Sequence, residues 1–75
     1  MLLLYMLEEC PYCKRVIKHL EEKQIEYRAL DIQNPVNLDE LIHLGGEQQV
    51  PFLVDTEKNV KMYESEDIIE FIDTL

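Results

Sequence analysis

The apolar positions of this chain predict seven short elements, in the order strand, helix, strand, helix, strand, strand, helix. Residues 2–6 form an apolar run bounded by Glu8 and Glu9, as is typical of a buried central strand. From Pro11 to about Lys23 the apolar spacing changes to that of a helix. The predicted buried stripe of this helix consists of Cys13, Val16, Ile17 and Leu20.

A second strand and a second helix are predicted in the middle of the chain. The strand spans residues 25–32, where apolar side chains are flanked by charge, and the Asn-Pro pair after it breaks the pattern. The helix is capped by Asn34 or Asn37 and ends at Gly45-Gly46. Its apolar residues are Leu38, Leu41, Ile42 and Leu44.

The last third of the chain predicts a hairpin and a third helix. Strands are expected over residues 50–54 and 60–63, on either side of a polar turn. Ser65 is expected to cap the final helix. The side chains predicted to face inward from this helix are Ile68, Ile69, Phe71, Ile72 and Leu75.

This element order predicts an α/β fold of the form βαβαββα. The first unit requires parallel strands joined by a right-handed crossover, and the second is an antiparallel hairpin with a covering helix. We therefore expect a mixed four-stranded sheet flanked by three helices, with helices on both faces. A chain of 75 residues is expected to form a single domain over residues 1–75.

Composition and charge exclude several classes of partner. The hydrophobic content of 47% is that of a globular domain rather than a disordered chain. The formal net charge of −9 repels phosphates and anionic lipid surfaces, so neither nucleic acid nor membrane is an expected partner. Residues 1–7 lack the basic leader and cleavage site of a signal peptide, and a cytoplasmic location is expected.

The two cysteines are the candidate chemistry. Cys10 and Cys13 are so close in sequence that a bridge between them would stabilise the fold very little. In a reducing compartment such a pair is typical of a redox couple. Cys10 lies at a predicted helix start, where unpaired N–H groups and the helix dipole favour the nucleophilic thiolate. Cys13 lies one turn further on the same face, where it is expected to resolve a mixed disulfide.

The cysteine pair has two other interpretations. A structural zinc site needs four ligands, typically two such pairs or added histidines. The only histidines, His19 and His43, are expected on the surface, so no metal site is predicted. An inert structural pair is the second alternative. Redox chemistry is favoured over both.

Three motifs together carry a family resemblance. Cys10-Pro11-Tyr12-Cys13, Val50-Pro51 before an apolar strand, and Glu64-Ser65 at the last helix resemble a dithiol glutaredoxin over essentially the whole chain. The Glu-Ser pair also resembles the N-terminal domain of glutathione transferases, which shares this fold. The resemblance implies a thioredoxin-like fold with strand order 2-1-3-4. It also implies glutathione as the electron donor and no bound cofactor.

The resemblance also assigns roles to individual residues. Cys10 matches the nucleophile and Cys13 the resolving thiol. Pro51 matches a cis-proline, after the residue whose backbone pairs with the cysteinyl unit of glutathione. Free N–H groups at Ser65 are expected to hold the γ-glutamyl carboxylate. The full set of implied glutathione contacts is Tyr12, Val50, Pro51, Ser65, Glu66 and Asp67.

One departure from the family pattern concerns charge. Many glutaredoxins carry Lys or Arg three residues before the first cysteine, where this chain has Leu7 followed by Glu8 and Glu9. Negative charge beside the nucleophile disfavours the thiolate and repels the glycine carboxylate of glutathione. The residues available as substitutes are Lys14, Arg15 and Gln49.

The expected function is glutathione-dependent reduction of protein disulfides and protein–glutathione mixed disulfides by a monomeric enzyme. One alternative keeps the disulfide chemistry but uses a flavoprotein reductase as the electron donor. Another is a metal-binding module in which two chains share an iron–sulfur cluster through Cys10 and glutathione, although Pro11 stiffens the loop and disfavours it.

Overall fold

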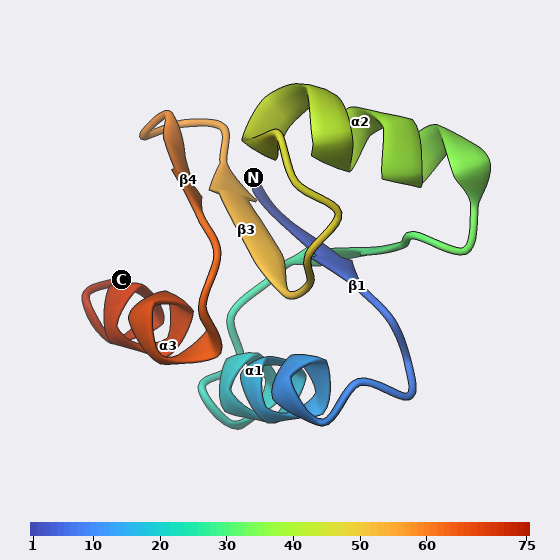
Figure 1. Ribbon diagram of the computed structural model, residues 1–75. Helices are drawn as coiled ribbons and strands as arrows, with labels where there is room; N and C mark the ends of the chain where they lie inside the picture. Colours follow the sequence, from blue (N-terminus) through green and yellow to red (C-terminus); the bar gives the residue numbers. More distant parts are fainter.

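The computed structural model describes residues 1–75 and contains the seven predicted elements in the predicted order βαβαββα (Figure 1). The elements are β1 (Leu2–Met6), α1 (Pro11–Glu22), β2 (Arg28–Asp31), α2 (Pro35–Gly45), β3 (Phe52–Asp55), β4 (Val60–Met62) and α3 (Ser65–Asp73).

The four strands form one mixed sheet in the order β2-β1-β3-β4. β1 is parallel to β2, with Leu3 opposite Arg28 and Met6 opposite Asp31. β3 is antiparallel to both β1 and β4. The sheet thus confirms the mixed topology and the thioredoxin-like strand order.

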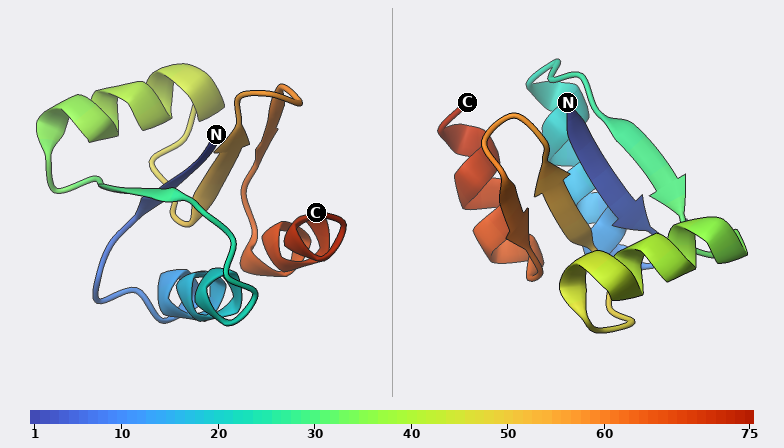
Figure 2. Two further views of the ribbon diagram at one scale, coloured as in Figure 1. Left: turned by 180° about the vertical axis from the view of Figure 1, so that it is seen from behind. Right: turned by 90° about the horizontal axis from the view of Figure 1, so that it is seen from above.

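Helices cover both faces of the sheet, as predicted. α1 and α3 lie side by side on one face and α2 lies on the other (Figures 1 and 2). Leu4 of β1 points to the first face and packs with Val16 and Leu20 of α1, whereas Tyr5 points to the second and packs with Leu41 of α2. The alternation of side chains along a strand therefore divides the core into two layers.

The layer beneath α2 is built around three aromatic rings. Phe52 is only 1% exposed, and its ring centroid lies 5.9 Å from that of Tyr5 and 4.5 Å from that of Tyr63. Gly45, at the end of α2, lies against this cluster, because a Cβ atom there would approach Tyr63 Cζ to 2.8 Å. Aromatic packing thus holds the end of α2 close to β3 and β4.

Ion pairs join α1 to α3 along their contact. Arg15 bonds Glu66 at 2.9 Å, and Asp73 accepts bonds from Lys23 at 2.9 Å and His19 at 2.8 Å. Lys23 and His19 hold the pKa of the Asp73 carboxyl below its usual value. His19 is therefore only partly exposed and paired rather than a free surface residue.

Three strand boundaries differ from the sequence prediction, each for a tertiary reason. The second strand begins at Arg28 rather than residue 25, because Ile25 and Tyr27 pack against the α1 layer before the chain reaches β1. The third spans Phe52–Asp55 rather than residues 50–54, since pairing with β1 starts after Pro51. The fourth ends at Met62.

The caps and last residues of the helices also test the prediction. Asn34 is the cap of α2, and Gly46 ends that helix with a left-handed φ of 88°. Leu75 was expected to face inward, but it lies beyond α3 and is 48% exposed. No helix has the length and apolar character needed to cross a bilayer.

Candidate active site

The first cysteine sits at the junction between β1 and α1. Cys10 is the N-cap of α1, with extended backbone angles, and Pro11 occupies the first helical position. The Cys10 sulfur accepts a hydrogen bond from the backbone N–H of Cys13 at 3.4 Å. The side chain is partly exposed. The predicted location of Cys10 at a helix start is therefore correct, and an N–H group of that helix points at its sulfur.

The second cysteine lies inside the protein. Cys13 is 0% exposed and packs with Val16 and Leu20 against the sheet. Burial, together with the smaller effect of the contact with Cys10, raises the pKa of the Cys13 thiol to about 12, while a backbone hydrogen bond from Leu7 acts in the opposite direction. Cys13 is therefore a protonated thiol at neutral pH.

This difference between the two thiols predicts selective alkylation. In a Cys10→Ser variant at neutral pH, iodoacetamide should modify Cys13 more than about a hundredfold more slowly than a free cysteine, because only the thiolate reacts. The rate should rise as the pH approaches the raised pKa of about 12. Mass spectrometry measures the rate, and the same variant in urea is the control. Equal rates in the folded and unfolded chain would contradict the burial of Cys13.

The loop before β3 forms the second part of the site. The Val50–Pro51 peptide bond is cis, as the family resemblance implied. The pairing of β3 with β1 begins at Phe52, opposite Tyr5. The backbone of Val50, two residues earlier, therefore takes no part in the hydrogen bonding between these strands. Its N–H and C=O groups are thus available to a peptide-like ligand.

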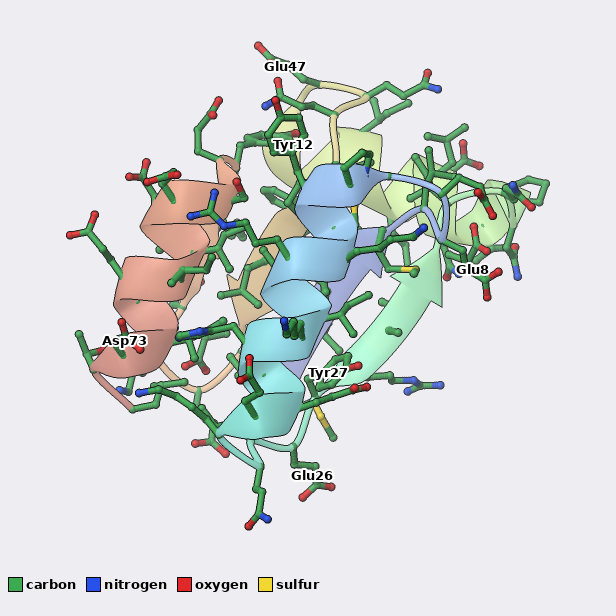
Figure 3. All side chains as sticks on the ribbon, turned by 90° about the horizontal axis from the view of Figure 1, so that it is seen from below. Glu8, Tyr12, Glu26, Tyr27, Glu47 and Asp73 are labelled. Atoms are coloured by element: carbon green, nitrogen blue, oxygen red, sulfur yellow. The ribbon has the colours of Figure 1, made fainter.

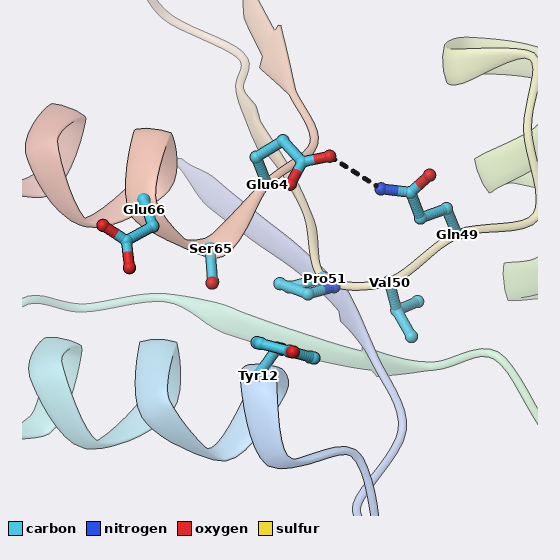
Figure 4. A pocket seen from close by; sticks show the side chains of 7 residues that line it. All are labelled: Tyr12, Gln49, Val50, Pro51, Glu64, Ser65 and Glu66. Carbon is cyan, nitrogen blue, oxygen red and sulfur yellow. Dashed lines mark hydrogen bonds between the residues drawn. The ribbon is translucent and has the colours of Figure 1, made fainter.

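A cavity of about 430 Å³ lies between the start of α1, this loop and the start of α3 (Figure 4). Tyr12, which is 62% exposed, forms one wall, and Pro51 lies across from it. The lining residues are Tyr12, Gln49, Val50, Pro51, Glu64, Ser65 and Glu66. Three separate parts of the chain therefore build one cleft.

The start of α3 differs from the prediction that Ser65 is its cap. Glu64 is the N-cap, with a positive φ of 62° and no side-chain capping bond, and Ser65 is the first helical residue. Because Glu64 turns the chain into the helix, the largely buried Ser65 lines the cavity instead of bonding the helix end. The first amides of α3 remain without intrahelical partners.

Five of the six predicted glutathione contacts line the cavity together: Tyr12, Val50, Pro51, Ser65 and Glu66. Asp67 is in the first turn of α3 but is not a lining residue, and neither cysteine is. Cys10 lies two residues before the lining residue Tyr12 in the sequence.

Glu64 and Gln49 are lining residues that the predicted contact set omitted. Gln49 Nε2 donates to Glu64 Oε1 at 3.3 Å, so the two side chains bridge the loop before β3 and the start of α3 (Figure 4). The Glu-Ser pair was the available signal for Glu64, since it resembles glutathione transferases. The sequence indicates Gln49 only as a substitute for the missing basic residue.

The comparison with protein families covers nearly the whole chain. The model of the glutathione S-transferase N-terminal domain matches residues 4–75. The chain belongs to this family. No curated protein sequence matches it.

This family member is similar to solved structures of both glutathione transferases and glutaredoxins. Glutathione transferase Omega 3C from Trametes versicolor is 31% identical over 97% of this chain and 32% of that chain, with a TM-score of 0.84. Glutaredoxin 2 from Salmonella typhimurium, solved in complex with glutathione, is 25% identical over 97% of this chain and 33% of that chain, with a TM-score of 0.83. The chain thus spans about a third of these two proteins.

A shorter glutaredoxin shares the fold. The protein from Archaeoglobus fulgidus is 23% identical, and the match covers 95% of this chain and 84% of that chain with a TM-score of 0.75. The family and the fold therefore identify a thioredoxin-like protein of the glutaredoxin and glutathione transferase N-terminal type. This type of protein suggests thiol–disulfide or glutathione-related chemistry.

Proposed function

We propose that the protein is a glutaredoxin-type oxidoreductase that reduces protein disulfides and protein–glutathione mixed disulfides with electrons from glutathione. One observation carries the proposal. The Cys10 sulfur caps α1 and accepts the Cys13 N–H at 3.4 Å, while the Cys13 thiol is buried. The Cys10 sulfur is therefore accessible for attack on a substrate. The Cys13 thiol is buried one helical turn away, where it can react in a later step.

The first step is attack by the Cys10 thiolate on a sulfur of the substrate disulfide. A bond forms between Cys10 and that sulfur, the substrate S–S bond breaks, and the other sulfur leaves as a thiolate. The Cys13 N–H and the positive end of the α1 dipole stabilise the attacking thiolate, by about 0.3–1 kcal/mol for the dipole at exposed sites. Tyr12 forms the wall beside which the mixed disulfide lies.

The second step releases the product by one of two routes. If glutathione is attached to Cys10, a second glutathione thiolate attacks the glutathione sulfur, which gives glutathione disulfide and restores Cys10. If a protein is attached, Cys13 loses its proton and attacks the Cys10 sulfur. This releases the protein thiol and forms the Cys10–Cys13 disulfide, which two glutathione molecules reduce.

Glutathione is proposed to bind along the cleft. Its cysteinyl unit pairs with the free backbone of Val50, beside Pro51. Its γ-glutamyl carboxylate binds the unpaired amides at the start of α3 and the Ser65 hydroxyl. Glu66 and Asp67 lie in the first turn of α3, and we propose that they accept hydrogen bonds from the γ-glutamyl ammonium group.

Three observations support glutathione as the donor. Five residues that the resemblance assigned to glutathione contact line one cavity. The family is that of glutathione S-transferase N-terminal domains. Salmonella Glutaredoxin 2, a similar protein, was solved with glutathione bound. We further propose that residues 1–75 act as one domain, as a cytoplasmic monomer with no bound cofactor or metal.

The test is oxidation of NADPH coupled through glutathione reductase, with a glutathionylated peptide as substrate. We expect a rate proportional to the concentration of the protein. A parallel reaction replaces glutathione and its reductase with thioredoxin reductase. Turnover only in that second reaction would contradict glutathione as the donor. Iron–sulfur absorbance after anaerobic purification, without turnover in either reaction, would contradict the proposal that the protein is an enzyme.

A further inference from the structure

The walls of the cleft are strongly acidic. The segments that supply its lining residues, taken as residues 8–15, 47–51 and 64–67, hold six carboxylates and two cations: Glu8, Glu9, Glu47, Glu64, Glu66 and Asp67 against Lys14 and Arg15. Two of the carboxylates line the cavity itself, and none of the seven lining residues is Lys or Arg. The redox cleft therefore lies in a region of negative potential.

The cations near the cleft offset only part of this charge. Arg15 forms an ion pair with Glu66 at 2.9 Å, which balances one of the two carboxylates that line the cavity. Gln49, which bonds Glu64, is neutral and leaves the negative charge of that carboxylate in place. Lys14 follows Cys13 on α1 and is the only other cation on these segments.

The acidic side chains also extend past the cavity toward the nucleophile. Glu8 and Glu9 are exposed and immediately precede Cys10. Figure 3 shows Tyr12 and Glu47 at the end of the molecule where α1 begins, Glu8 along one side near the end of β2, and Glu26 at the opposite end. A protein substrate that presents a disulfide to Cys10 must therefore bring its flanking residues close to Glu8 and Glu9.

Building on the proposed function, we propose that the preferred substrates are protein disulfides whose cysteine is flanked by Lys or Arg. Such a substrate brings cations to Glu8 and Glu9 as its sulfur reaches Cys10. Complementary charge accelerates encounter between proteins, whereas like charge beside the contact slows it. Acid-flanked disulfides are thus poor substrates.

The experiment follows the first attack alone, so that it does not depend on the electron donor. Two peptides carry one cysteine bonded to 5-thio-2-nitrobenzoate, with the cysteine flanked by lysines in one and by glutamates in the other. The Cys10 thiolate of pre-reduced protein attacks the peptide sulfur, and the coloured thiolate leaves. Each rate is divided by the rate of the same peptide with 2-mercaptoethanol, which corrects for intrinsic reactivity.

We expect the lysine peptide to react about tenfold faster at low salt, and the ratio to approach one at high salt. A Glu8→Lys/Glu9→Lys variant should lose most of the ratio. The matched control, Glu22→Lys/Glu26→Lys, makes the same charge change at the far end of α1 and should keep it. If the variant fails to fold, the salt dependence of the unmodified protein still decides.

The outcomes separate this inference from the proposed function. Equal corrected rates for both peptides at low salt would overturn the substrate preference while leaving disulfide exchange intact. A ratio lost equally in the control variant would also overturn it, because net charge rather than the cleft would then be responsible. No reaction with either peptide would overturn the proposed function itself.

Discussion

Replacing Cys10 with serine is expected to abolish turnover in the glutathione-coupled assay, by at least about a thousandfold. Serine is not ionised at neutral pH and cannot form the mixed disulfide on which both routes depend. Because Cys10 is a partly exposed helix cap and serine is itself a good cap, the fold should be retained. The coupled NADPH assay measures activity, and circular dichroism checks folding.

The matched control is Cys13→Ser. This variant should keep activity on glutathionylated peptides, since a second glutathione can attack the mixed disulfide at Cys10 directly. It should lose activity on intramolecular protein disulfides, which need the resolving thiol to release the product. Equal activity of Cys10→Ser and the unmodified protein would contradict the assignment of Cys10. Activity of Cys13→Ser on both substrates would contradict that of Cys13.

Replacing Phe52 with alanine is expected to lower the free energy of unfolding by about 3–5 kcal/mol. Phe52 is 1% exposed and contacts the rings of Tyr5 and Tyr63, so its loss leaves a cavity beneath α2. Small domains are stable by only about 5–15 kcal/mol, so the variant should lose a large share of its free energy of unfolding. Urea unfolding followed by circular dichroism measures the change.

Two controls isolate the packing contribution. Phe52→Leu keeps most of the volume and should cost less than half as much as alanine. Val36→Ala removes apolar atoms from α2 at a position that is 64% exposed, and should change stability by less than about 0.5 kcal/mol. A Phe52→Ala variant as stable as Val36→Ala would show that the aromatic layer is not required for the fold.

Phe52 also links stability to the site. It follows Pro51 directly and begins the pairing of β3 with Tyr5 of β1. The position of Val50 and Pro51 against Tyr12 therefore depends on a buried ring on the opposite face of the sheet. The shape of the cleft therefore depends on packing beneath α2 as well as on α1 and α3, which border the cleft.

Most of the fold and the position of both cysteines could be predicted from local sequence. The apolar run at residues 2–6, the helical spacing after Pro11 and the caps at Asn34 and Gly46 depend on neighbouring residues only. Strand and helix periodicities and capping bonds act over a few positions, so the sequence carries them directly. The Cys-Pro-Tyr-Cys motif at a strand–helix junction was predictable for the same reason.

The details of the cleft were not predictable from those patterns. The bonds Gln49–Glu64 and Arg15–Glu66 join residues far apart in the chain, and the positive φ of Glu64 moves Ser65 from the cap into the cavity wall. The sequence by itself determined the elements, their order and the redox pair. Only the tertiary structure decided which carboxylates line the cavity, because the packing of three distant segments, and no local periodicity, brings the lining residues together.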